Sequence, residues 1–217
     1  MQPPRASPFL VFACGVLWLL IVGAGMAGLW AYARSPGAEG SAPRAWPAAS
    51  SVHLESDRAT LIMLVHPHCP CTRASIHELD RLMARTQGLF VAHVLFLLPD
   101  GVEDDWTQTD LWRTAAAIPG VNVAIDANGR ESALFGAATS GLTLVYDASG
   151  RLLFEGGITP ARGHEGDSPG AEAIASLLRG ETAGPNHAPV FGCSLRNPGR
   201  AITARPGSRN GRCRPPP

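Results

Sequence analysis

The feature of the sequence that most constrains the fold is a long apolar run close to the amino terminus. Residues Phe9 to Ala33 contain no Asp, Glu, Lys or Arg. A helix needs about 20 consecutive apolar residues to cross the hydrocarbon core of a bilayer, so this run can span with some tilt. Trp30 and Tyr32 lie at its end, where aromatic side chains favour the membrane interface. We therefore expect residues 1–34 to form a transmembrane anchor, with the lipid bilayer as the partner of residues 9–33.

A cleaved leader is the alternative, because Ala31-Tyr32-Ala33 has the small-x-small pattern of a signal-peptide cleavage site. The apolar core of a signal peptide is about 7 to 15 residues long, and this run is much longer. Arg5 precedes the run and Arg34 follows it, so charge alone does not orient the anchor. The thiol chemistry described below favours a cytoplasmic amino terminus, with the domain on the periplasmic side of the inner membrane.

Composition divides the rest of the chain into three parts. Residues 35–51 are rich in Ala, Pro, Gly and Ser, which is typical of a flexible linker. Residues 52–195 have the length and apolar content of one compact domain. Residues 196–217 are rich in Arg, Pro and Gly, and we expect a disordered tail. The formal net charge of the chain is zero, which gives no indication of a nucleic-acid partner.

Apolar runs of strand length alternate with helical patterns in the domain. Thr60–Val65 is a continuous apolar run, as expected of a strand buried on both faces. Further strands are predicted at 89–98, 121–125, 142–146 and 152–154, and helices at 72–86, 104–118, 128–135 and 170–178. Strands that alternate with helices and then end in a hairpin and a helix predict an α/β fold, with a mixed sheet flanked by helices.

The chemical centre of the sequence is His66-Pro-His-Cys-Pro-Cys71, between the first strand and the first helix of the domain. Side chains two positions apart in a regular helix diverge by about 200°. The two cysteines can therefore approach each other only if the first one precedes the helix. Pro70 is favoured at the first helical position, where its missing N–H loses no hydrogen bond. Cys69 is thus predicted to be the N-cap residue, with Cys71 in the first turn.

A thiolate at a helix N-cap faces unpaired backbone N–H groups and the positive end of the helix dipole, and both lower its pKa. His66 and His68 would act in the same direction if they donated hydrogen bonds or carried charge. We expect Cys69 to be the attacking thiol and Cys71 the resolving thiol of a thiol–disulfide exchange. The chain has 5 cysteines, an odd number that does not fit a fully paired disulfide framework.

The sequence from Thr60 to Leu178 resembles the thioredoxin-like superfamily, in particular its membrane-anchored extracytoplasmic branch. The similar segments of the domain are Thr60–Met83, Val121–Asp126, Phe135–Gly136, Thr143–Asp147 and Gly150–Leu152. The motifs His66–Cys71, Arg162–Asp167 and Val190–Cys193 are similar to those of bacterial proteins labelled RedB. The resemblance implies a thioredoxin-like domain on one membrane anchor. It also implies that the cysteine pair reacts with the thiols or disulfides of partner proteins.

Two features depart from that superfamily. Its cysteine pair is normally Cys-x-x-Cys, whereas a single residue separates Cys69 and Cys71. The superfamily also places a cis-proline before its third core strand, facing the cysteines, where this sequence has Gly141 and Leu142. In the superfamily that proline blocks metal binding and helps to position a peptide substrate. Its absence leaves room for a metal ion.

The alternative to redox chemistry is a copper- or other metal-binding chaperone module that uses the same cluster. Cys69, Cys71 and His68 offer thiolate and imidazole ligands that copper or zinc accepts. Because so short a loop cannot readily surround a metal, a ligand from elsewhere would be needed. Cys193 is the candidate, since the apolar patch Pro189–Cys193 is expected to dock back onto the domain.

The glycine-rich segment Gly156–Asp167 lies between the predicted hairpin and the last helix. No Lys-Ser/Thr pair follows its glycines, so it is not a phosphate-binding loop. His164, Glu165 and Asp167 would approach Cys69 if the end of the hairpin lies near the cysteines. The residues predicted to support the site are His66, His68, Pro70, His164 and Cys193.

Overall fold

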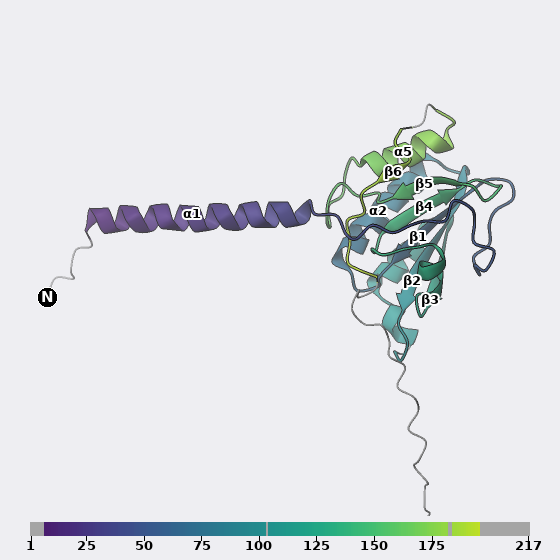
Figure 1. Cartoon of the computed structure of the whole chain (residues 1–217), viewed down its shortest axis with the longest axis horizontal. Coiled ribbons are helices and arrows are strands. Elements are labelled where there is room, and N and C mark those ends of the chain that lie inside the picture. The colour runs from purple at the N-terminus through teal and green to yellow at the C-terminus, as the bar shows by residue number, and fades with distance from the viewer. Residues whose placement is uncertain (1–6, 103, 182–183, 196–217) are drawn as a thin grey trace, which may run out of the picture.

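The computed structural model describes residues 7–102, 104–181 and 184–195, which form a long helix and a domain (Figure 1). The helix is α1 (Pro8–Ala33). The elements of the domain that these residues form are β1 (Ala59–Val65), α2 (Pro70–Arg85), β2 (Phe90–Leu98), the 3-10 helix η1 (Asp104–Thr107), α3 (Asp110–Ala116), β3 (Val121–Ala127), α4 (Arg130–Leu134), β4 (Leu142–Tyr146), β5 (Leu152–Gly156), α5 (Pro169–Leu178) and β6 (His187–Ala188).

The strands form one mixed sheet in the order β3-β2-β1-β4-β5-β6. Strand β1 is parallel to β2, β2 is parallel to β3, and β6 is parallel to β5. Strand β4 is antiparallel to both of its neighbours. Strand β1 lies at the centre of the sheet and is buried from Thr60 to Val65. Its carboxyl end therefore presents the residues that follow it at the middle of one sheet edge.

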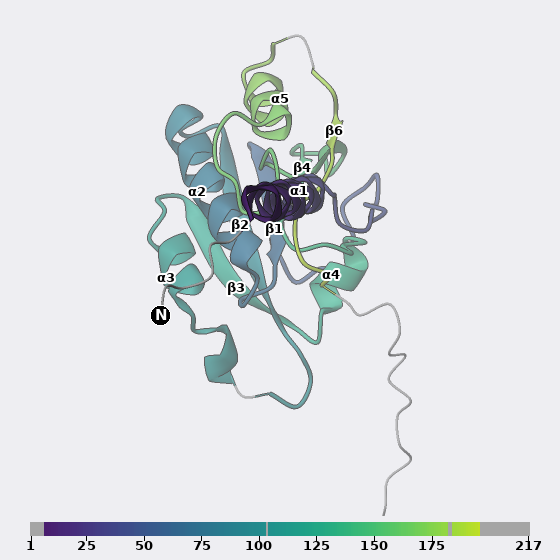
Figure 2. The same ribbon diagram turned by 90° about the vertical axis from the view of Figure 1, so that its left-hand side faces the viewer.

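The side chains of β1 alternate between two hydrophobic cores, one on each face of the sheet. Leu61, Met63 and Val65 belong to the core that also contains residues of α2, α3 and α5. Ile62 and Leu64 belong to the other core, together with residues around α4. Figure 2 shows α2 and α3 on the opposite side of the sheet from α4. The helices thus cover both faces of the sheet, as the alternation of predicted elements indicated.

Helix α1 projects away from the domain (Figure 1), and none of its residues is buried. Within the described part of the chain it is the one helix long and apolar enough to cross a membrane. A signal sequence at the same position would meet the same criteria of length and composition. The structure thus shows one amino-terminal helix that could span a bilayer.

Residues 35–51 lie along the domain, where their composition predicted a flexible linker. The backbone N–H of Ser41 donates to Gly136 O at 3.1 Å, and that of Trp46 donates to Gly150 O at 2.7 Å. The Trp46 ring also packs edge-on against the rings of Phe135 and Tyr146, at centroid distances of 5.3 and 5.2 Å. Composition did not reveal these contacts, because the groups that bind the segment come from distant parts of the sequence.

The segment 104–118 contains two helices where one was expected. The Thr109 hydroxyl accepts a hydrogen bond from the backbone N–H of Trp112 at 3.4 Å, so Thr109 caps α3 and separates it from η1. Strand β6 was not predicted, since its two residues are too few to show the alternation of apolar and polar side chains that is typical of a strand. The predicted disordered tail, 196–217, lies outside the described residues.

Candidate functional site

Cys69 is the N-cap residue of α2, at the end of the short loop that follows β1. Its backbone is extended, with φ −86° and ψ 120°, and Pro70 occupies the first turn. Cys69 N donates to His66 O at 3.1 Å, and Thr72 N donates to Cys69 O at 3.0 Å. These bonds fix the backbone of Cys69 at the start of the helix, where its side chain forms no capping hydrogen bond.

Three thiols meet at this point. The Sγ atoms of Cys69 and Cys193 are hydrogen-bonded at 2.7 Å, and Cys193 N donates to Cys69 Sγ at 3.4 Å. The Cys71 thiol lies near enough to Cys69 for a charge on Cys69 to raise the pKa of Cys71, after burial, which is the larger cause. All three are free cysteines in the structure. Cys69 is 1% exposed, whereas Cys71 and Cys193 are half-buried. Cys69 is therefore the covered centre of a cluster whose other two thiols reach the surface.

Opposing effects set the pKa of Cys69, and their sum lowers it. Burial raises the pKa, because it disfavours the charged thiolate. The hydrogen bond from the Cys193 thiol and the nearby backbone N–H groups of Cys193, Cys71 and Thr72 favour the thiolate and outweigh burial. The Cys69 side chain forms no capping hydrogen bond within α2, and the backbone N–H that donates to its sulfur is that of Cys193.

The pKa values of the two surrounding thiols move in the opposite direction. Burial raises the pKa of Cys71, and the charge of Cys69 and the hydrogen bond to it act in the same sense. Burial and the same interactions with Cys69 raise the pKa of Cys193 to about 12. The Arg162 guanidinium opposes both shifts, but does not overcome them. The cluster therefore favours one thiolate, on Cys69, held by two protonated thiols.

We expect a titration of the reduced protein at 240 nm, where thiolates absorb, to show one thiol that ionises below the ordinary thiol pKa of 9.0. This step should be absent from Cys69→Ser and present in Cys14→Ser. A lowered pKa means that the thiolate stabilises the reduced fold above the ordinary pKa, and that this stabilisation is lost as the pH falls through the lowered value. A low-pH step that survives in Cys69→Ser would assign the thiolate to another cysteine.

The two predicted histidines lie beside the cluster, but their rings face Trp106. The His68 ring nitrogen Nε2 lies 3.0 Å from Trp106 O, and the His66 and His68 ring centroids lie 5.3 and 4.6 Å from the Trp106 ring. His66 Nδ1 accepts a hydrogen bond from His68 N at 3.1 Å. Burial lowers the pKa of His66, and the neighbouring His68 adds to this shift. His66 is thus favoured as a neutral ring that shapes the loop.

Ser140 is a site residue that the sequence did not reveal. Its hydroxyl accepts a hydrogen bond from His66 N at 2.9 Å and lies 2.9 Å from Thr72 Oγ1. Its backbone N–H donates to Cys193 O at 2.8 Å. Ser140 therefore joins the loop after β1, the first turn of α2 and the Cys193 segment. A single serine before a strand belongs to no motif or periodic pattern, so the sequence did not identify Ser140 as a site residue.

Arg162 connects the thiol cluster with the end of α1. Its backbone N–H donates to Ala33 O at 2.9 Å, and its guanidinium lies over the Tyr32 ring, 5.1 Å from the centroid. The Nη1 group donates to Gly192 O at 2.6 Å, next to Cys193. Arg162 belongs to the motif that carried the resemblance, but no local pattern distinguished it from its acidic neighbours as a site residue.

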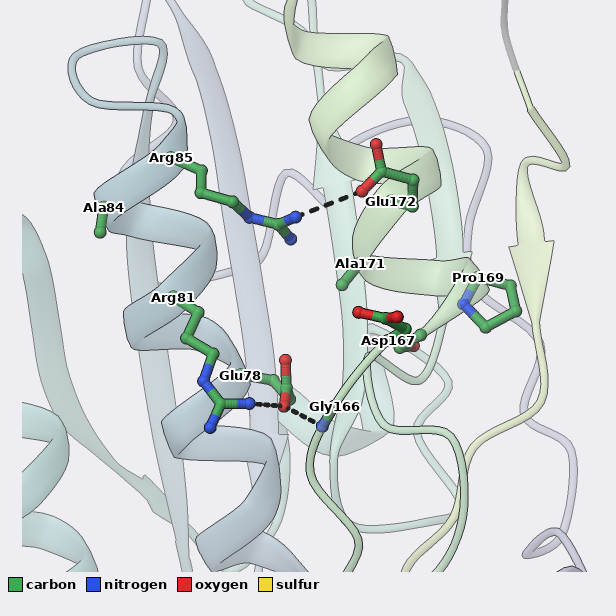
Figure 3. A pocket seen from close by; sticks show the side chains of 10 residues that line it. Glu78, Arg81, Ala84, Arg85, Gly166, Asp167, Pro169, Ala171 and Glu172 are labelled. Carbon is green, nitrogen blue, oxygen red and sulfur yellow. Dashed lines mark hydrogen bonds and ion pairs between the residues drawn. The ribbon is translucent and has the colours of Figure 1, made fainter.

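The acidic residues of the same loop face the later turns of α2. Glu165 binds His77 at 2.7 Å and Arg81 at 2.9 Å, so it lies along the side of the helix. Asp167 lines a cavity of about 790 Å³ between α2 and α5 (Figure 3). His164 is exposed, with Nδ1 2.8 Å from Arg162 O. The loop meets the cysteines at its beginning, where the charge of Arg162 and the backbone N–H of Gly163 oppose the rise that burial and Cys69 cause in the pKa of Cys71.

Glu78 fixes this loop to α2. Its carboxylate is 3% exposed and accepts hydrogen bonds from Gly166 N at 2.7 Å and from Arg81 Nη1 at 2.6 Å. Figure 3 shows these contacts at one end of the cavity, with the Arg85–Glu172 ion pair above them. Ion pairs between α2, the loop and α5 thus border this open cavity, and none of the cysteines that the structure describes lines it.

The edge before β4, where the resemblance implied a cis-proline, has trans backbone. The described residues contain no cis peptide bond, and Gly141 has a φ of +91°. The chain's own Ser194 forms an antiparallel bridge with Thr139 of this edge, and Leu195 N donates to Ala138 O at 2.9 Å. The segment around Cys193 is therefore hydrogen-bonded to the residues that precede β4. In the described part of the chain, no group of three or more His, Cys, Asp and Glu side chains is arranged to hold a metal ion.

Comparisons with known proteins show what the fold resembles. The structure is similar to a hypothetical protein from Sinorhizobium meliloti, with 19% identity and a TM-score of 0.55, over 74% of this chain and 93% of that one. An uncharacterized conserved protein from Geobacillus kaustophilus matches with 19% identity and a TM-score of 0.55, over 77% of this chain and 94% of that one. An exposed lipoprotein thioredoxin from Streptococcus pneumoniae matches with 16% identity and a TM-score of 0.43, over 58% and 86%. No family model and no curated protein matches the sequence.

The chain has a thioredoxin-like fold, preceded by one apolar helix that could cross a membrane. The order of the strands, their mixed directions and the cysteine at the start of α2 agree with the fold expected from the sequence. At these identities the comparisons establish the fold, and the chemistry has to be argued from the site.

Proposed function

We propose that this protein is a membrane-anchored thiol–disulfide redox protein that acts on protein thiols or disulfides outside the cytoplasm. The observation that carries the proposal is the surroundings of the Cys69 sulfur. It belongs to the N-cap residue of α2, accepts a hydrogen bond from Cys193 N at 3.4 Å, and lies 2.7 Å from the sulfur of Cys193. The thiolate is the nucleophile in disulfide exchange, and this site stabilises a thiolate on Cys69.

In the reducing direction, the Cys69 thiolate attacks one sulfur of a partner disulfide. The S–S bond of the partner breaks, and its leaving thiolate takes a proton. Cys71 then attacks Cys69 Sγ in the mixed disulfide and releases the second partner thiol, so that two electrons pass from the cysteine pair to the partner. The raised pKa of Cys71 suits this order, because it stays protonated until Cys69 has lost its charge in the mixed disulfide. The oxidised pair would run the same steps in reverse.

The end of α1 supports a partner close to the membrane. Ala33, the last residue of the helix, is hydrogen-bonded to Arg162, which in turn contacts the segment that carries Cys193. A bilayer around α1 would therefore lie on the side of the domain where the cysteines are. Disulfides persist in oxidising compartments, so we place the domain on the periplasmic side of the inner membrane.

Copper binding by Cys69, Cys71, His68 and Cys193 is the competing hypothesis. The close approach of the sulfurs favours it, since thiolates are preferred ligands of Cu(I). The position of His68 does not, because its ring is held at Trp106. Titration of the reduced full-length protein with Cu(I) separates the two hypotheses. Tight stoichiometric binding that Cys69→Ser abolishes, without disulfide turnover, would overturn the redox proposal.

We expect the double variant Cys71→Ser/Cys193→Ser, expressed in its native membrane, to accumulate mixed disulfides between Cys69 and partner proteins. Both thiols beside Cys69 are then absent, so no thiol of the cluster can release the intermediate. The adducts are detected as a mobility shift on non-reducing gels that disappears on reduction, and the attached proteins are identified by mass spectrometry. The triple variant Cys69→Ser/Cys71→Ser/Cys193→Ser is the matched control and should show no adduct. Adducts that persist in this control would mean that Cys69 is not the attacking thiol.

A further inference from the structure

The segment 187–195 is fixed on the domain at both ends of Cys193. Strand β6 pairs with β5, and Val190 O accepts a hydrogen bond from Gly37 N at 2.8 Å. After Cys193, the Leu195 side chain is 6% exposed and packs in the core on the α4 face. The placement of the Cys193 sulfur is therefore determined by a folded segment, although Cys193 lies far from Cys69 in the sequence.

Close packing at Gly192 fixes the segment over the turn before β4. A Cβ atom at this position would lie 1.9 Å from the backbone oxygen of Ser140, so no larger residue fits without moving the segment. Gly192 O also accepts the hydrogen bond from the Arg162 guanidinium at 2.6 Å. This close approach brings Cys193 N and Cys193 Sγ to the sulfur of Cys69 at once.

Cys71 is less favourably placed as a partner for Cys69. It lies in the first turn of α2, two positions after the N-cap residue Cys69, so a disulfide between them would have to close across a single residue. Cys193 instead approaches from a separate segment, and its sulfur already lies 2.7 Å from that of Cys69. A bond between residues so distant in the chain also restricts the unfolded state more than a bond across one residue.

We propose that Cys193 is the redox partner of Cys69, and that oxidation joins these two sulfurs and fastens the segment 187–195 over the start of α2. The inference rests on the proposed function and changes the assignment of its second thiol. After Cys69 has formed a mixed disulfide with a partner, Cys193 loses its proton to the departing partner thiolate and attacks Cys69 Sγ. The bond between Cys69 and the partner breaks, and the partner leaves as a thiol. Two electrons have then passed from the Cys69–Cys193 dithiol to the partner disulfide.

The bond would have a direct consequence for access to the site. Cys69 is 1% exposed under this segment, so a partner can reach its sulfur only when the segment is displaced. In the oxidised protein Cys71 can attack Cys69 Sγ and release Cys193 as a thiol, with no net transfer of electrons. The disulfide would then lie between Cys69 and Cys71, and the segment would be free to move. The three thiols would thus hold one disulfide in a closed or an open arrangement.

Peptide mapping of the oxidised full-length protein tests the assignment. Trypsin leaves Cys69 and Cys71 together in the peptide Ala59–Arg73, and Cys193 in Gly180–Arg196. After oxidation with a small disulfide, digestion under non-reducing conditions should give these two peptides cross-linked, and the cross-link should disappear on reduction. Cys71→Ser should retain the cross-link, and Cys193→Ser should lose it. Recovery of Ala59–Arg73 only as an unlinked peptide lighter by two hydrogens, with no cross-linked species, would overturn the inference.

Gly192→Ala tests the role of the segment without removing a thiol. The added methyl group would meet Ser140 O and move Cys193 away, so we expect loss of the cross-linked peptide while all thiols remain titratable. Gly184→Ala is the matched control, since the atoms nearest to its added Cβ lie at ordinary contact distances of 3.8 and 3.9 Å. It should give the wild-type cross-link. A full cross-link in Gly192→Ala would show that the observed packing does not position Cys193.

The outcomes also separate this inference from the proposed function. Disulfide turnover with an internal Cys69–Cys71 bond would leave the redox function standing and assign its second thiol to Cys71. Absence of turnover and of both internal disulfides would overturn the function and the inference together. A cross-link with turnover that Cys193→Ser abolishes and Cys71→Ser retains is the result expected if Cys193 is the partner.

Discussion

Cys69→Ser should abolish disulfide turnover by the full-length protein, reducing it to the rate observed without protein. The hydroxyl of serine is not ionised near neutral pH and is a poor nucleophile towards sulfur, so the backbone N–H groups at the start of α2 have no thiolate to stabilise. The measurement is the reduction of an added protein disulfide, such as insulin, in the presence of a dithiol. The expected loss is complete, because in the proposed mechanism every exchange step forms or breaks a bond to Cys69.

The fold should survive this substitution. Serine is close to cysteine in size, and its oxygen can accept the hydrogen bond of Cys193 N in place of sulfur, so we expect the free energy of unfolding to change by about 1 kcal/mol or less. Cys14→Ser is the control for a cysteine outside the domain and should retain full turnover. Turnover that continues in a folded Cys69→Ser protein would show that another thiol is the nucleophile.

Trp46→Ala should lower the free energy of unfolding of the domain by about 2 to 3 kcal/mol. The Trp46 ring is half-buried and packs edge-on against Phe135 and Tyr146, two of the largest fully buried side chains of the core on the α4 face. Truncation would remove these contacts and open the core to solvent at the place where the amino-terminal segment crosses it. Urea unfolding, followed by circular dichroism, measures the change.

The matched control is Trp18→Ala, which deletes the same side chain from the middle of α1. Because α1 contributes no buried residue to the domain, we expect the stability of the domain to change by less than about 0.5 kcal/mol. If residues 35–51 behaved as a flexible linker in solution, the two substitutions would have equal and small effects. A large effect of Trp46→Ala alone would establish that the folded unit begins before residue 52.

The sequence was informative wherever a local pattern decides the structure. The continuous apolar run of β1 places it at the centre of a sheet, and Pro70 directly after Cys69 sets the N-cap of α2. Both follow from interactions within a few residues. The division of 104–118 into two helices was missed, because a Thr at position 109 is equally compatible with a helix interior and with a cap.

The neighbours of the Cys69 sulfur could not be derived in the same way. Ser140 and Arg162 lie far from Cys69 in the sequence and belong to segments without regular periodicity. The acidic residues of the Arg162 loop were predicted to approach Cys69 because they are ionisable. The backbone of the loop instead places them along the side of α2, away from the cysteines. The chemical type of a residue indicated whether it could take part in the site. The path of the backbone determined which of these residues lie beside the Cys69 sulfur.

By itself, the sequence determined that this protein has an apolar helix of membrane-spanning length, a mixed sheet flanked by helices, and a cysteine at the start of the first helix of its domain. These features depend on apolar periodicity and on the backbone geometry of a few adjacent residues. Only the tertiary structure decided that Cys193 lies 2.7 Å from Cys69, and that the segment after α1 packs on the domain. The physical reason is that both are contacts between distant segments, whose meeting depends on how the whole sheet is assembled and covered.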